Sequence, residues 1–250
     1  MKAPAYDRMG VDYSQVRRAD PRFEAAIWEA LGEARSVLNI GAGAGSYEPR
    51  DREVIAVEPS PVMIAQRPPG AARAIQGVAE DIPLADEGVD ATMGVFTMQH
   101  WDDVDRGLAE VLRVTRGRVV LLTLDLDVTA EMWLCRDYLP EIVEHDRGTF
   151  PTIAHLESTL PNVRVATIPV PSDCTDGFCV ALWSRPEVHL DPDVRRSSSI
   201  WHLLPAAVVE IALDRLRSDL ESGEWDRRYG QLRETGSLDV GLRLVTAELR

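Results

Sequence analysis

The stretch from Val37 to Ser46, which reads VLNIGAGAGS, constrains the fold of this chain more than any other segment. An apolar, β-branched run that ends in glycine is typical of a buried parallel strand. Alternating glycines directly after such a strand let the backbone approach a ligand closely, because no Cβ is in the way. We therefore predict a nucleotide-binding turn made by Gly41, Ala42, Gly43 and Gly45.

A second apolar run, at residues 54–57, leads into an acidic residue. Glu58 ends this run and lies seventeen residues beyond Gly41. A carboxylate at the end of a strand can accept hydrogen bonds from both hydroxyls of a ribose. Strand, glycine turn and acid together predict an adenosine site.

The class of cofactor is narrowed by what the glycine turn lacks. The dinucleotide fingerprint has Gly or Ala at the position of Ser46, so that the helix can lie close to the strand, and the serine argues against NAD. The phosphate-loop pattern GxxxxGK[ST] does not occur, so a nucleoside triphosphate site of that kind has no support.

Two further apolar runs, at residues 74–79 and 89–96, continue the strand pattern. Asp81 follows the first run, with Ile82 beside it, and its carboxylate could accept a hydrogen bond from an adenine amino group. The second run ends at Phe96 and opens into a polar segment. Strands that alternate with helical segments predict a doubly wound parallel sheet.

These four motifs, in this order, resemble those of the class I S-adenosylmethionine-dependent methyltransferases, in particular the small-molecule group similar to the ubiquinone and menaquinone biosynthesis methyltransferases. The resemblance covers roughly residues 35–125. It implies S-adenosylmethionine as cofactor, S-adenosylhomocysteine as product, and a Rossmann-like seven-stranded α/β sheet in the order 3-2-1-4-5-7-6 with strand 7 antiparallel. The residues that we expect around the cofactor are Tyr13, Gly41, Ala42, Gly43, Gly45, Glu58, Pro59, Met63, Asp81, Ile82, Phe96 and Thr97.

The length of the chain predicts one large domain with an added lobe. With 250 residues, of which 45% are hydrophobic, the chain can bury a full core. We expect an N-terminal lid and first helix at 1–35, the cofactor-binding methyltransferase core at 36–185, a helical lobe at 186–237, and a final strand at 238–250 that returns to the core.

Local signals predict several elements outside the motifs. Asp20 and Asp102 are expected to cap two helices. Beyond residue 128 we expect a helical segment around 129–145, a strand near 163–166 and its hairpin partner at 178–183. One helical stripe in the lobe is made by Val209, Leu213, Leu216 and Leu220. We expect this stripe to pack the lobe against the sheet, with a dimer contact or the roof of an acceptor pocket as alternatives.

Charge and cysteine usage exclude some partners and indicate a compartment. The formal net charge of -14 repels phosphate backbones, so we expect no nucleic acid partner. Cys135, Cys174 and Cys179 give no even disulfide framework, and no long apolar span is present, which favours a reduced, cytoplasmic protein without a membrane partner. No histidine lies near Cys174 and Cys179, so no metal is expected. The oligomeric state is not indicated.

The chemistry implied by the resemblance is an in-line displacement at a carbon activated by a positive sulfonium, for which the protein mainly aligns and desolvates the reactants. A phenol, hydroxyl, amine or enol acceptor also loses a proton, which a general base can take. His100 follows the fourth apolar run and is our candidate for that base. The alternative is that His100 caps a helix or binds a loop.

Contacts with a small-molecule substrate are expected from three segments. Tyr6 and Tyr13, in the segment that folds over the cofactor in similar enzymes, either cover the site together with Arg17 or pack the first helix. The turn-like segment 172–178 is expected to lie near the substrate mouth. The substrate residues that we predict are Tyr6, Trp133, Asp137, Tyr138, Asp173 and Thr175. Trp133 and Tyr138 are five apart and do not share an α-helical face, so at least one of them should be core.

Three functions remain open at this level. The leading one is methyl transfer to a small-molecule acceptor through an oxygen, nitrogen or carbon nucleophile. A second keeps the cofactor but uses the sulfonium for non-methylating chemistry, and a third is an inactive cofactor-binding module. A nicotinamide-dependent dehydrogenase is a distant fourth, because Ser46 and the segment after residue 96 do not suit it.

Overall fold

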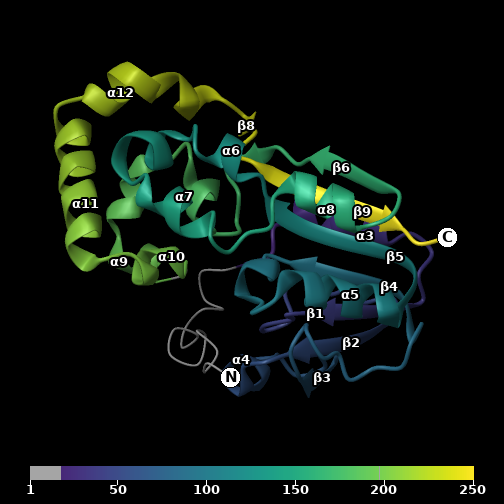
Figure 1. Cartoon of the computed structure of the whole chain (residues 1–250). Coiled ribbons are helices and arrows are strands. Elements are labelled where there is room, and N and C mark those ends of the chain that lie inside the picture. Colours follow the sequence, from purple (N-terminus) through teal and green to yellow (C-terminus); the bar gives the residue numbers. More distant parts are fainter. Residues whose placement is uncertain (1–17, 197) are drawn as a thin grey trace.

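A seven-stranded sheet forms the body of the computed structural model, which describes residues 18–196 and 198–250 (Figure 1). Its order is β3-β2-β1-β4-β5-β9-β6. In that order the strands are β3 (Arg73–Gln76), β2 (Glu53–Glu58), β1 (Ser36–Ile40), β4 (Val89–Val95), β5 (Thr115–Leu124), β9 (Leu242–Glu248) and β6 (Val163–Thr167).

The sheet confirms the expected order, with the last strand inserted antiparallel. The strand β9 is antiparallel to both β5 and β6, whereas the other neighbours pair in parallel. The predicted hairpin partner at 178–183 is wrong, because Cys179–Leu182 form a short 3-10 helix, η3. The carboxyl-terminal strand takes the place beside β6 instead. A short apolar run is compatible with either structure, and burial alone cannot separate them.

Alternate side chains of each central strand enter two separate cores. Val120 of β5 faces the core shared with Phe23 and Ile27, whereas Val119 faces the core shared with Leu108. The helix α3 (Pro21–Leu31) therefore covers one face of the sheet, and α5 (Val104–Val114) and α8 (Ile153–Thr159) cover the other (Figure 1). A shorter helix, α4 (Pro61–Ala65), follows β2.

The two predicted helix caps have different outcomes. Asp20 caps α3 as expected, and its side chain accepts a hydrogen bond from the amide of Arg22. The cap of α5 is Asp103, not Asp102, and it accepts from the amide of Arg106. Two adjacent acids leave the cap ambiguous by one residue in the sequence.

A helical lobe lies beyond the carboxyl ends of the parallel strands (Figure 1). Its elements are η4 (Pro186–Leu190), α9 (Pro192–Arg195), α10 (Ile200–Leu203), α11 (Ala206–Glu221), α12 (Glu224–Tyr229) and η5 (Gly230–Glu234). A two-stranded ribbon, β7 (Val170–Pro171) with β8 (Ser237–Leu238), joins the lobe to the chain before and after it. On α11, three members of the predicted stripe are buried and Leu220 is partly buried against the core.

The segment around 129–145 is largely helical, as expected, but it is broken into three short pieces. The pieces are α6 (Leu126–Thr129), a π-helical turn η2 (Leu134–Tyr138) and α7 (Glu141–Asp146). These pieces lie between β5 and the lobe (Figure 1). They form the part of the core that reaches the carboxyl edge of the sheet, where ligands bind in doubly wound folds.

Candidate functional site

The glycine turn after β1 adopts left-handed backbone at each of its three glycines. Gly41, Gly43 and Gly45 have φ angles of 66°, 51° and 94°, a region that favours glycine. The amides of Gly41 and Ala42 both donate to the carbonyl of Val57, at 2.8 and 3.1 Å. These two bonds fix the turn against the end of β2.

Glu58, at the end of β2, is buried, and its carboxylate bridges two backbone amides. Oε2 accepts from the amide of Gly43 at 2.8 Å, and Oε1 accepts from the amide of Ser60 at 2.9 Å. Ser60 in turn caps α4 by accepting from the amide of Met63, whose side chain lies over Gly43. A carboxylate at the end of a strand is an acceptor of the kind that ribose hydroxyls require.

A buried ion pair, which the sequence did not reveal, supports the glycine turn. Arg67 Nη2 lies 2.7 Å from Glu48 Oε2, and the two side chains are only 5% and 9% exposed. Asn39 Nδ2 donates to Glu48 Oε1 at 3.0 Å, and Arg67 Nη1 donates to the carbonyl of Gly43 at 3.3 Å. The turn is therefore held by side chains from both β1 and the segment after α4.

The predicted adenine-side residues lie after β2 and β3. Asp81 is exposed, and its amide donates to the carbonyl of Val78. Ile82 is buried, and its amide donates to Glu110 Oε2 at 2.9 Å. Pro59 is partly buried. The exposed carboxylate of Asp81 is thus the member of this group that can reach a polar ligand atom.

Phe96 and Thr97 bring the end of β4 against the glycine turn. Phe96 has a φ of 48°, which is uncommon for a bulky residue, and its ring lies 5.0 Å from that of Phe178 between centroids. Thr97 is buried, and its Oγ1 accepts from Trp101 Nε1 at 3.1 Å. A Cβ added to Gly41 would collide with the Thr97 side chain. The ends of β1 and β4 therefore meet at the switch point of the sheet.

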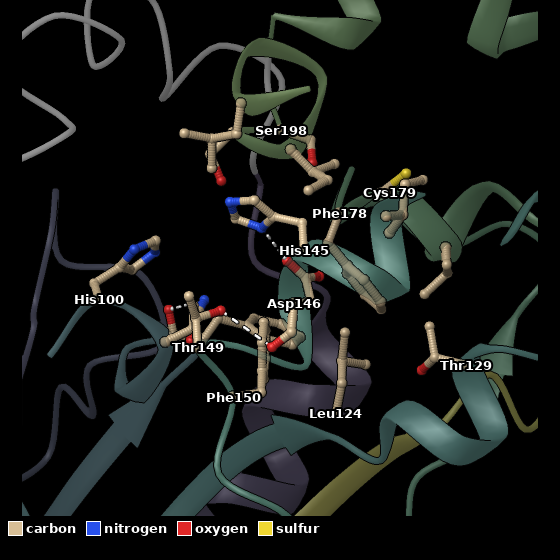
Figure 2. Close-up of a pocket in the computed structure, with 17 residues that line it drawn as sticks. His100, Leu124, Thr129, His145, Asp146, Thr149, Phe150, Phe178, Cys179 and Ser198 are labelled. Atoms are coloured by element: carbon tan, nitrogen blue, oxygen red, sulfur yellow. Dashed lines mark hydrogen bonds and ion pairs between the residues drawn. The ribbon is translucent and has the colours of Figure 1, made fainter. Parts of the chain in front are cut away.

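A cavity of about 100 Å³ opens beside Phe96, between the ends of β4 and β5 and the lobe (Figure 2). Its aromatic walls are Phe96, Phe150 and Phe178, and its aliphatic walls include Leu124 and Ile200. These residues come from segments that are distant in the sequence. Only the folded chain brings them together.

Two histidines and a carboxylate supply polar groups to this cavity. His100 is exposed at the end of the 3-10 helix η1 (Met98–His100), so the predicted base does line the cavity. His145 and Asp146, at the end of α7, line it too, with His145 Nδ1 3.1 Å from Asp146 Oδ1. Burial raises the pKa of Asp146, and the hydrogen bond with His145 offsets part of that rise. The sequence signal that could have indicated these two residues is that the histidine and the aspartate are adjacent.

Three predicted substrate residues lie where the core meets the lobe. Trp133 is buried, and its ring meets Tyr138 edge to face at 5.7 Å between centroids. The Tyr138 hydroxyl donates to Asp219 Oδ2 at 2.6 Å, and Arg228 Nη2 donates to Asp137 Oδ2 at 2.8 Å. None of the three lines the cavity beside Phe96. Their contact with substrate stays a prediction that this geometry does not favour.

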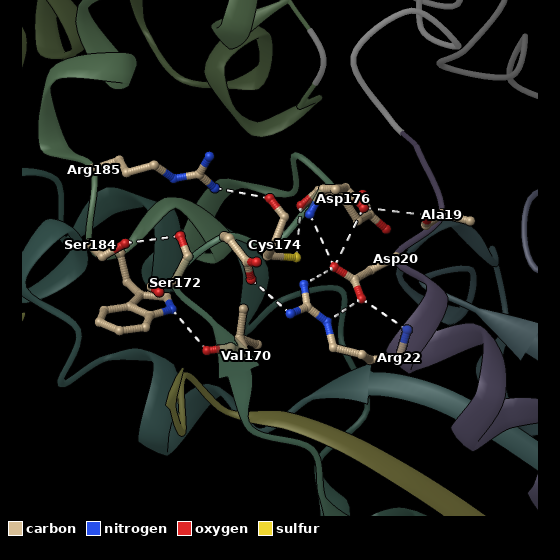
Figure 3. A network of polar contacts seen from close by, with 12 residues as sticks. Ala19, Asp20, Arg22, Val170, Ser172, Cys174, Asp176, Ser184 and Arg185 are labelled. Carbon is tan, nitrogen blue, oxygen red and sulfur yellow. Dashed lines mark hydrogen bonds and ion pairs between the residues drawn. The ribbon is translucent and has the colours of Figure 1, made fainter. Parts of the chain in front are cut away.

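Two more predicted substrate residues join a polar network at the start of α3 (Figure 3). Asp173 Oδ1 accepts from Arg22 Nη1, and the amide of Thr175 donates to Asp20 Oδ2. Burial would raise the pKa of Asp20, but hydrogen bonds from Arg22 and Thr175 hold that pKa well below its usual range. This network anchors the segment that leads to Phe178. Asp173 and Thr175 therefore do not line the cavity themselves, but help to position its wall residue Phe178.

Some of the expectations concern absences or residues outside the structure. Within residues 18–196 and 198–250, no group of three or more His, Cys, Asp or Glu side chains is placed to hold a metal ion. In the same ranges, no helix has both the length and the apolar character needed to cross a membrane. Tyr6, Tyr13 and Arg17 fall outside the described residues.

Comparison with known proteins gives a consistent result. The family model described as a methyltransferase domain matches residues 38–123, which run from β1 to β5. A solved structure of a candidate methyltransferase from an antibiotic biosynthesis pathway of Anabaena variabilis is 32% identical. That match covers 94% of this chain and 100% of the other, with a TM-score of 0.86.

Two curated relatives match over a shorter region. The demethylmenaquinone methyltransferase of Thermobifida fusca is 40% identical over 110 residues, which are 39% of this chain and 46% of the relative. An uncharacterized methyltransferase of Mycobacterium tuberculosis is 40% identical over 109 residues, which are 40% of this chain and 44% of the relative. The match therefore spans less than half the length of these curated relatives.

Proposed function

Since the chain belongs to the class I S-adenosylmethionine-dependent methyltransferases, we propose that it transfers a methyl group to a small-molecule acceptor held in the cavity beside Phe96. The cofactor of this family is S-adenosylmethionine, which supplies a methyl group on a positively charged sulfur and so activates the carbon for in-line displacement. The acceptor and its nucleophilic atom are the new elements of the proposal.

The residues at the switch point fit this cofactor. The left-handed glycines leave the edge of β1 free of side chains, and a Cβ on Gly43 would meet only Met63. Glu58 would accept hydrogen bonds from the ribose hydroxyls, and Asp81 would accept from the adenine amino group. Phe96 would border the methionine portion.

The observation that carries the proposal is the position of Phe96. This residue directly follows β4 at the predicted cofactor edge and also forms a wall of the cavity. An acceptor in the cavity would therefore lie beside the cofactor, which is what in-line transfer requires. The cavity volume of about 100 Å³ is of the order of cavities that hold one aromatic ring. We therefore propose a compact, largely apolar acceptor, with His100 as one group able to take its proton.

The proposal is tested first by calorimetric titration of the full chain with S-adenosylmethionine, S-adenosylhomocysteine and NAD. We expect micromolar binding of the two sulfur nucleosides and no binding of NAD. Glu58→Gln should weaken S-adenosylhomocysteine binding by about 1 to 3 kcal/mol if Glu58 holds the ribose. Glu53→Gln is the matched control, because Glu53 is exposed at the other end of the same strand.

Acceptors are then screened with a labelled methyl donor, and the products are identified by mass. Label that appears in a small molecule supports methyl transfer. Cofactor consumption with an unlabelled, rearranged product would support the non-methylating alternative instead. Failure of both sulfur nucleosides to bind, with an intact fold by circular dichroism, would contradict the proposal.

A further inference from the structure

We infer that His145, oriented by Asp146, takes the proton from the methyl acceptor, and that the acceptor is an aromatic hydroxyl compound of about one ring in size. This inference rests on the proposed function. It adds a base that the motifs did not indicate and a substrate class for the cavity.

The geometry of the pair is that of an oriented histidine base. His145 Nδ1 lies 3.1 Å from Asp146 Oδ1, and both side chains are largely covered, at 33% and 16% exposed. When Nδ1 carries the hydrogen and donates it to a carboxylate, Nε2 keeps a lone pair. In the described part of the chain, no hydrogen bond or ion pair involves Nε2. Nε2 can therefore accept a hydrogen bond from a ligand, and the His145 ring that carries it lines the cavity (Figure 2).

Asp146 gives His145 an advantage over the other groups of the cavity. A carboxylate beside the imidazole stabilises the imidazolium that forms when the base accepts a proton. The other titratable groups that line the cavity are His100 and Cys179. His100 is exposed, and burial raises the pKa of the Cys179 thiol well above its usual value, so that thiol stays protonated. On α7 itself, Glu141 and Glu144 are the remaining acids.

The walls of the cavity favour a flat ring. Phe96, Phe150 and Phe178 offer aromatic faces and edges, which associate with an aromatic ligand in stacked or edge-to-face arrangements. A neutral aromatic hydroxyl is a weak nucleophile that becomes strong on losing its proton, so a base has most effect on this acceptor. An aromatic amine carries a free lone pair and needs no base before it attacks.

The transfer step moves one proton to His145 and one methyl group to the acceptor. The acceptor oxygen gives its proton to His145 Nε2, and its electron pair forms the new bond to the methyl carbon. The carbon–sulfur bond breaks, with its electron pair remaining on sulfur. His145 is left as an imidazolium beside Asp146 and returns its proton to water.

The tautomer of His145 provides a test that needs no activity. Nitrogen-15 NMR of the full chain at pH 8, assigned by loss of one signal in His145→Gln, should show hydrogen on Nδ1 of His145. Asp146→Ala should shift that ring toward hydrogen on Nε2. His155 is an internal reference, because its Nε2 rather than Nδ1 contacts Asp105, at 2.7 Å. A neutral His145 with hydrogen on Nε2 in the unmodified protein would overturn the orientation that we infer.

Methyl transfer supplies the second test, with 4-methylphenol and 4-ethylphenol as hydroxyl acceptors and 4-ethylaniline as the matched amine. His145→Gln should lower the rate with the hydroxyl acceptors by about 10² to 10⁴-fold. It should also remove the acid limb of the rate–pH profile, while leaving S-adenosylhomocysteine affinity unchanged. His155→Gln, in the exposed pair on α8, should keep the rate within about twofold.

The outcomes separate this inference from the proposed function. A greater loss in His100→Gln than in His145→Gln would assign the base to His100 and overturn ours. Two outcomes would overturn the substrate class and leave the proposed function standing. One is methylation of the amine but of neither hydroxyl compound. The other is methylation of none of the three compounds although S-adenosylhomocysteine binds. Only the absence of cofactor binding would remove both.

Discussion

Acid should destabilise the junction between core and lobe, because His189 is buried there in its uncharged form. The side chain is 1% exposed, and its ring lies 5.6 Å from Trp133 and 5.8 Å from Trp201 between centroids. Burial, together with the nearby charges of Arg195 and Arg185, lowers the pKa of His189 from 6.5 to about 3. Its Nδ1 has no hydrogen-bond partner in the described residues.

The sign and size of the effect follow from this shift. Between pH 6.5 and about 3 the unfolded chain binds a proton at His189 that the folded chain does not, so stability falls as the pH falls. The contribution is fully present above pH 6.5 and is lost down to about pH 3. Each pH unit in this window changes the free energy of unfolding by about 1.4 kcal/mol, which gives about 2 kcal/mol at pH 5.0 and about 5 kcal/mol at pH 3.

Urea unfolding followed by tryptophan fluorescence at pH 7.5 and pH 5.0 measures this contribution, because Trp133 and Trp201 surround the imidazole. His189→Gln removes the titration, so its loss of stability between the two pH values should be smaller than that of the unmodified chain by about 2 kcal/mol. His155→Gln, in an exposed pair, should retain the full loss. Equal losses in the unmodified chain and in His189→Gln would refute the reasoning.

Two further predictions concern the glycine turn. Gly41→Ala should weaken S-adenosylhomocysteine binding in calorimetry by at least about 2 kcal/mol, because its Cβ would collide with the Thr97 side chain at a left-handed φ. Gly70→Ala, which has a φ of 85° but meets nothing within 4 Å, should leave binding unchanged. Glu48→Gln should lower the free energy of unfolding by about 3 kcal/mol in urea titrations, because it leaves the Arg67 charge buried and unpaired. Asp51→Asn, at an exposed carboxylate paired with Arg52, should cost less than about 0.5 kcal/mol, and equal effects of the two would contradict this account.

The sheet could be predicted from the sequence because each of its central strands carries a local signal. Apolar runs bounded by glycine or acid mark β1, β2 and β4, and the resemblance to known methyltransferases supplied their order. The same kind of signal failed at 178–183, where a buried apolar run forms a 3-10 helix. Tertiary contacts rather than propensity decide such short segments.

Trp133 and Tyr138 are both buried, which confirms the expectation that at least one of them is core. Their contact with each other could not be predicted, because residues five apart do not share an α-helical face. A π-helical turn spans Leu134–Tyr138 and closes bonds between residues five apart, which brings the two rings within 5.7 Å. No pattern in the sequence predicted this π-helical turn.

The cofactor edge and the cavity differ in how well they could be predicted from the sequence. The cofactor edge is built from short motifs at the ends of neighbouring strands, so Gly43 and Glu58 could be paired before their hydrogen bond was known. The cavity is built from segments that meet only after folding, and of its lining the sequence indicated His100, Phe96 and, through the segment 172–178, Phe178. The rest depends on the path of the chain through α7 and the lobe.

The cofactor edge and the cavity should respond differently to acid. The cofactor edge rests on β1, β2 and β4, whereas part of the cavity wall is Ile200 of α10, in the lobe that packs around His189. We therefore expect acid below pH 6.5 to act first on the wall proposed to hold the acceptor and only later on the turn proposed to hold the cofactor. Acceptor affinity should fall before S-adenosylhomocysteine affinity as the pH is lowered, and His189→Gln should bring the two losses together.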